Sequence, residues 1–196
     1  MGTDPYLNSW IRIFDAIASG GVHRQPYVHL GRTPPFFRKF GLAPFDLVIV
    51  PGKIARAIRE HPEVGSDVWH RLPGLLRSPV AILPSQRRDG SIITVLAVQD
   101  SAGDPVFVPI TAAPDRAANL VLSVYGKQSG ATWLAREIAQ AKSDGLNVFV
   151  ERSFAASLPQ PGSVSEDTIP SSPGPIPADG TAKPKREILH LRKKST

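Results

Sequence analysis

Apolar residues near the start of the chain recur with the spacing of one helix face. Between residues 6 and 18 they stand three or four positions apart, at Leu7, Trp10, Ile11, Phe14 and Ile17. This spacing predicts an amphipathic helix, and the two glycines at 20 and 21 end it. We expect the helix to pack against the main body or a partner and to carry no chemistry of its own.

The next part of the chain predicts shorter elements. Residues 27–47 are largely irregular, apart from an apolar piece at 36–40 that predicts about two helical turns. Residues 45–50 are typical of a strand, and a Pro-Gly turn then starts a helix that the proline at 62 stops. A second helix is expected over 66–76, with Ser66 as its N-cap and Pro73 breaking it.

The pattern then changes to short apolar runs typical of strands. Strands are expected over 80–83, 91–99 and 106–110, and the sequence DSAGD fits a hairpin turn between the last two. A strand over 118–125, a helix over 129–142 and a strand over 147–151 complete the series. Strands joined by short turns, with helices at the front and near the end, predict an α+β fold around an antiparallel sheet.

Composition divides the chain into three parts: a helical extension (1–26), an α+β domain (27–156) and a tail (157–196). The tail holds seven prolines and few large apolar residues. It cannot bury enough surface to offset the entropy of ordering, so we expect a disordered linker. Its basic end, KPKREILHLRKK, has two interpretations: a segment that folds on an acidic partner or nucleic acid, or a solvated tail.

Charge and cysteine content limit the function without naming it. The net charge is +6 and the pI about 9.9, which suits a polyanionic partner but does not require one. The absence of cysteine excludes disulfides, cysteine nucleophiles and thiolate metal sites, and it allows action in the cytoplasm. We find no secretory signal peptide and no apolar run long enough to cross a membrane.

The helix expected after residue 50 carries a lysine and a histidine. His61 lies seven positions after Ile54 and three after Ile58, at the end of the apolar stripe that faces the sheet. It fits a hydrogen-bonded structural histidine, and it also fits a base or acid that works near neutral pH. Lys53 lies about 12 Å away at 1.5 Å per residue, so both side chains could touch one extended substrate but not each other.

Period-two alternation in the strand after residue 118 places Ser123, Tyr125 and Lys127 on one face. An ordinary solvent-exposed face explains such a row. If the face is concave and close to His61, Lys127 can neutralise a phosphate while Ser123 and Tyr125 hydrogen-bond its oxygens.

Other catalytic signatures are missing from the sequence. It contains no glycine-rich nucleotide loop, no HExxH and no GxSxG motif. His23, His29 and His70 lack the spacing and the nearby carboxylate pairs of a metal site. We therefore expect no metal and no other cofactor.

Five short motifs follow one another in an order that resembles a known family. They are GRTPPFFRKFGL, LVIVPGKIARAIREHPEV, LPGLLRSPVAILPS, VLAVQDSAGDPVFVPI and LVLSVYGK. Over residues 27–152 the chain resembles the C-terminal toxin domain of phage MuF-type head proteins. That family is similar to the barnase, EndoU, colicin and RelE-like nucleases.

The resemblance implies N-terminal helices packed on a curved antiparallel sheet whose concave face receives RNA. It implies a metal-independent endoribonuclease toxin or effector, in which the ribose 2′-hydroxyl attacks the phosphodiester. The family's catalytic positions match His61, Ser123, Tyr125 and Lys127, and its phosphate-binding positions match Lys53 and Lys127.

The same resemblance implies an immunity protein or antitoxin as a partner and action in the cytoplasm. Delivery would occur with a phage particle or by secretion as an effector. The alternative is a non-catalytic binding or structural module of a phage or prophage particle with the same fold.

Overall fold

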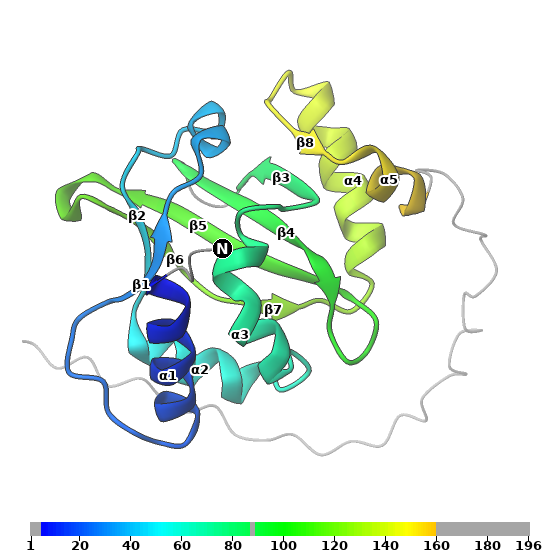
Figure 1. Ribbon diagram of the computed structural model, residues 1–196. Helices are drawn as coiled ribbons and strands as arrows, with labels where there is room; N and C mark the ends of the chain where they lie inside the picture. The colour runs from blue at the N-terminus through cyan, green and yellow to red at the C-terminus, as the bar shows by residue number, and fades with distance from the viewer. Residues whose placement is uncertain (1–4, 87–88, 160–196) are drawn as a thin grey trace, which may run out of the picture. The chain divides into compact units, whose positions relative to one another are not determined.

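The computed structural model describes residues 5–86 and 89–159 and has an α+β architecture (Figure 1). The strands in this part of the chain are β1 (Val28–Arg32), β2 (Asp46–Ile49), β3 (Ala81–Pro84), β4 (Ser91–Gln99), β5 (Pro105–Ala113), β6 (Ala118–Val121), β7 (Tyr125–Gly126) and β8 (Phe149–Val150). They form one sheet in the order β1-β2-β6-β5-β4-β3-β8, and β7 also pairs with β5. All of these pairings are antiparallel except the one between β2 and β6. The predicted fold class is confirmed.

Helices cover both faces of this sheet (Figure 1). They are α1 (Pro5–Ala18), α2 (Pro51–Glu60), α3 (Ser66–Leu75), α4 (Gly130–Ser143) and α5 (Arg152–Ser157), with the 3-10 helices η1 (Pro35–Phe40) and η2 (Pro114–Arg116). α1, α2 and α3 share one apolar cluster with Val106 and Val108 of β5, whereas α4 shares a second cluster with Phe107. Alternation along β5 thus separates the two cores.

Most elements expected from the sequence are present within a few residues of their predicted bounds. The helices expected over 6–18, 51–61 and 129–142 are α1, α2 and α4, and the apolar piece at 36–40 forms η1. The expected tail falls outside the described residues from position 160 onward.

The expectation that Pro73 breaks the second helix is wrong, because Pro73 lies inside α3; the N-cap is Gly65, not Ser66. A proline has no N–H, so the carbonyl of Trp69 four residues earlier loses its helical donor. The buried indole of Trp10 replaces that donor, with Nε1 donating to the Trp69 carbonyl at 2.7 Å. α1 therefore satisfies the backbone group that the proline leaves open.

Replacing Trp10 with phenylalanine is expected to lower the free energy of unfolding by about 1–3 kcal/mol, because the buried Trp69 carbonyl loses its donor. The loss should be smaller in a P73A background, where a backbone amide can donate to the same carbonyl. Urea denaturation of the wild type, both single variants and the double variant gives this difference, and shared packing effects cancel in it. Equal losses in the two backgrounds would contradict the assigned role of Trp10.

The single strand expected over 118–125 is also wrong, because it is split into β6 and β7. Between the pairs Ile110–Val121 and Phe107–Tyr125, residues 122–124 lie opposite only residues 108 and 109 of β5. One of those two is Pro109, whose carbonyl accepts a hydrogen bond but which has no N–H to return. The extra residue has the position of a β-bulge, a feature that often redirects side chains beside functional sites.

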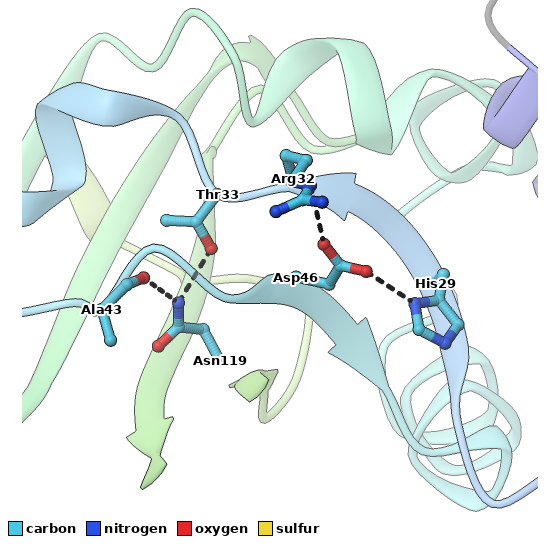
Figure 2. A network of polar contacts seen from close by, with 6 residues as sticks. All are labelled: His29, Arg32, Thr33, Ala43, Asp46 and Asn119. Carbon is cyan, nitrogen blue, oxygen red and sulfur yellow. Dashed lines mark hydrogen bonds and ion pairs between the residues drawn. The ribbon is translucent and has the colours of Figure 1, made fainter. Parts of the chain in front are cut away.

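The structure adds β1 to a segment that we expected to be irregular. β1 pairs with β2, and the register shifts between His29 and Gly31. Asp46 of β2 contacts His29 Nδ1 at 3.4 Å and Arg32 Nε at 3.5 Å (Figure 2). These exposed polar contacts link the two strands at this end of the sheet.

A buried asparagine anchors the loops on both sides of η1. Asn119 of β6 donates through Nδ2 to Thr33 Oγ1 at 2.8 Å and to the Ala43 carbonyl at 2.7 Å (Figure 2). Thr33 precedes η1 and Ala43 follows it, so one side chain holds both ends of this connection.

Candidate active site

α2 places His61 at the border between the core and solvent. His61 is the C-cap of α2, and its backbone N–H donates to the Ala57 carbonyl at 2.8 Å. Ile54 and Ala57 are buried, so the helix face that includes His61 is directed toward the sheet, as the spacing predicts. The His61 side chain keeps 30% of its surface exposed.

Glu63 orients the His61 ring. The distance from His61 Nδ1 to Glu63 Oε1 is 3.1 Å. An ionised carboxylate can only accept hydrogen bonds, so the contact requires Nδ1–H and leaves Nε2 of the neutral ring able to take up a proton. The neighbouring Glu60 is engaged elsewhere: Arg56 donates to both of its oxygens at 2.8 Å, and this hydrogen bond lowers the pKa of Glu60.

Tyr125 of β7 connects His61 to a row of aromatic rings. The ring centroids of His61 and Tyr125 are 5.5 Å apart, and those of Tyr125 and Phe107 are 5.7 Å apart. Trp133 of α4 meets Phe107 edge to face at 5.3 Å, and the Lys127 ammonium lies 5.1 Å from the Trp133 ring centroid. This aromatic row fixes the positions of the phenol and the ammonium relative to the imidazole.

A cavity of about 280 Å³ adjoins this row. It is lined mainly by Tyr125, Lys127, Ser85, Gln86, Trp133 and Glu137. The lining combines two aromatic walls with hydroxyl, amide, carboxylate and ammonium groups. Such a mixture suits a small ligand that presents a flat surface and a polar edge.

The turn between β4 and β5 holds the two halves of the site together. Asp100 is 9% exposed, and its Oδ1 accepts the backbone N–H groups of Ala102 and Asp104, both at 2.9 Å. In the same turn the N–H of Ser101 donates to the Glu63 carbonyl at 2.9 Å. The other Asp100 oxygen lies where a Cβ at Gly126 would stand. The turn therefore contacts both the segment that carries Glu63 and the segment between Tyr125 and Lys127.

The structure brings together three of the residues singled out from the sequence and places Lys53 apart from them. His61 contacts Tyr125, and Tyr125 and Lys127 line one cavity. Ser123 lies half-buried between β6 and β7, and within the described ranges its side chain makes no hydrogen bond to this group. Lys53 is exposed in the first turn of α2, at the far end of that helix from His61.

Sequence reasoning missed several residues of this site. Glu63 follows Pro62, outside the helical pattern, and its pairing with His61 depends on the turn that Pro62 introduces. Trp133 and Glu137 stand four residues apart on α4, so their shared helix face was available as a signal. Asp100 was placed in a turn, but its approach to Gly126 depends on the pairing of β7 with β5.

This fold and site define a small α+β domain with an oriented histidine beside a phenol and an ammonium group. Comparison with known families then identifies it: the chain belongs to the phage MuF-C-terminal domain family, whose model matches residues 53–152. The match begins at Lys53, in the first turn of α2, and includes β7 and α4. No curated protein and no solved structure matched the chain.

Two further observations concern the described residues. Within positions 5–86 and 89–159, no group of three or more His, Asp or Glu side chains is placed to hold a metal ion. In the same ranges, no helix has the length and apolar character needed to span a membrane.

Proposed function

We propose that this domain is a metal-independent endoribonuclease that acts as a toxin or effector, and that its fold is a branch of the barnase, EndoU, colicin and RelE-like nucleases. The observation that carries the proposal is the convergence of His61, oriented by Glu63, with Tyr125 and Lys127 at one place. RNA cleavage by its own 2′-hydroxyl needs a base, an acid and a cation beside the phosphate.

In the proposed reaction Nε2 of His61 takes the proton of a ribose 2′-hydroxyl, and the 2′ oxygen attacks the adjacent phosphorus. The bond from phosphorus to the 5′ oxygen breaks, leaving a 2′,3′-cyclic phosphate. The Tyr125 hydroxyl gives its proton to the departing 5′ oxygen, and the proton on His61 returns to Tyr125 through water. The Lys127 ammonium stabilises the negative charge that builds up on the phosphate oxygens.

The test is incubation of the purified protein with total RNA and with transfer RNA in excess chelator. Fragments with 2′,3′-cyclic phosphate and 5′-hydroxyl ends support the proposal. Intact RNA across pH 5 to 9 would contradict it and favour the alternative, a non-catalytic module of a phage particle. Membership in a phage domain family is the observation that favours this alternative.

As a nuclease, the domain would act in the cytoplasm and would need an immunity protein or antitoxin in its producer.

The two lysines proposed to bind phosphate are expected to differ in importance. Replacing Lys127 with alanine should lower the cleavage rate by about tenfold to a hundredfold, because its side chain lines the cavity beside Tyr125. Replacing Lys53 with alanine should change the rate by less than about threefold, since an exposed charge far from the site is screened by salt. Initial rates at two salt concentrations measure both effects. A larger loss for Lys53 would move the phosphate site to the start of α2.

A further inference from the structure

The cavity beside Tyr125 and Lys127 has the chemistry of a site for one nucleobase. We propose that it binds a guanine base of the RNA next to the cleaved phosphate, an inference that rests on the proposed function. Its volume of about 280 Å³ is just below the range of drug-sized ligand sites, about 300–1,000 Å³, and suits a single base better than a whole nucleotide.

Aromatic and apolar side chains give the cavity flat walls. Tyr125 comes from β7, Trp133 from α4 and Ile93 from β4, so three separate elements enclose it. The contacts of Phe107 with both Tyr125 and Trp133 fix these two rings in place. Proteins bind unstacked RNA bases between such walls and recognise them by hydrogen bonds to their edges.

The polar lining selects among the four bases through Glu137. Glu137 lines the cavity, and within the part of the chain that the structure describes its side chain forms no ion pair and no hydrogen bond. An ionised carboxylate only accepts hydrogen bonds. Guanine alone presents two adjacent donors on its pairing edge, N1–H and the N2 amino group. Adenine and cytosine place an acceptor beside their amino group, and uracil places acceptors on both sides of N3–H.

The position of the cavity connects base binding to cleavage. Tyr125 contacts the His61 ring and also lines the cavity, and Lys127 shares the same cavity. A base held there belongs to a nucleotide whose phosphate can reach the Lys127 ammonium and the His61 imidazole. Ser85 and Gln86 add a hydroxyl and an amide that can serve the remaining acceptors of guanine, O6 and N7.

Binding of the four ribonucleoside 3′-monophosphates tests this proposal directly. Titration calorimetry on the full chain is expected to show guanosine monophosphate binding at least about tenfold more tightly than the other three, which matches the discrimination of one bidentate contact. In a Glu137→Gln variant the preference should fall to about threefold or less. Asp144→Asn is the matched control, because it removes a charge from the end of the same helix outside the cavity, and it should keep the full preference.

Cleavage assays separate failure of this inference from failure of the proposed function. DNA strands with one ribonucleotide, varied in that base and in the next, show which position is recognised. Equal binding of the four nucleotides, or a guanine preference that survives Glu137→Gln, overturns the base site even if RNA is cut. Selective guanine binding without any cleavage overturns the nuclease proposal and leaves the base site standing.

Discussion

Replacement of His61 by asparagine is expected to lower the RNA cleavage rate by about a thousandfold. Asparagine approximates the size of the imidazole and can still hydrogen-bond Glu63, but it has no atom that takes up a proton near neutral pH. Proton transfer by one positioned side chain contributes about 10²–10⁴ to an enzymatic rate. Single-turnover assays with end-labelled RNA in chelator measure the loss, and circular dichroism together with the urea midpoint confirms that the variant is folded.

A second histidine of the same protein provides the control. His70 also pairs with a carboxylate, its Nε2 lying 2.6 Å from Asp15 Oδ1, and its side chain is 35% exposed. It joins α3 to α1 and lies outside the aromatic row. His70→Asn should therefore leave the cleavage rate nearly unchanged. Cleavage retained in His61→Asn, or an equal loss in both variants, would show that His61 is not the base.

The elements that could be predicted are those whose side-chain period is uninterrupted. The stripe of α1 continues along one unbroken helix, and that helix was located to within one residue. β1 was missed because its alternation of buried and exposed residues is interrupted. At its register shift Leu30 and Gly31, which are neighbours in sequence, are both buried. The same reasoning fails at Pro73, because whether a proline ends a helix depends on what replaces the missing hydrogen bond, and Trp10 is distant in sequence.

The candidate site could be predicted residue by residue but not as an assembly. The apolar stripe of α2 placed His61 toward the sheet, and alternation placed Tyr125 with Lys127. Their meeting depends on the parallel pairing of β2 with β6, which no local pattern indicates. Because the two strands run parallel, the chain leaves both at the same end of the sheet, into α2 after β2 and toward β7 after β6. The start of α2 and the segment leading to β7 therefore share that end, and the course of α2 then brings His61, its C-cap, to Tyr125.

Gly126 is the position where this assembly tolerates the least change. A Cβ added there would overlap the Asp100 carboxylate, whose other oxygen is held by two backbone N–H groups. Gly126→Ala therefore forces either the turn or β7 to move. We expect the free energy of unfolding to fall by about 1–3 kcal/mol, the usual cost of overpacking. We also expect cleavage to fall by about a hundredfold, because β7 carries Tyr125 and a displacement of 1 Å can have that effect.

Two comparisons make this prediction specific to the contact with Asp100. Gly74→Ala adds the same methyl group inside α3, where it meets no other atom, and should stabilise the protein by about 0.5–1 kcal/mol through helix propensity. Adding Asp100→Ala to Gly126→Ala removes the group that the new methyl overlaps. The loss of unfolding free energy in the double variant should therefore be smaller than the sum of the losses in the two single variants. Strictly additive losses would mean that the new methyl group acts through a contact other than the one with Asp100. A sub-additive result would identify the approach of the β4–β5 turn to β7 as the contact that keeps Tyr125 beside His61.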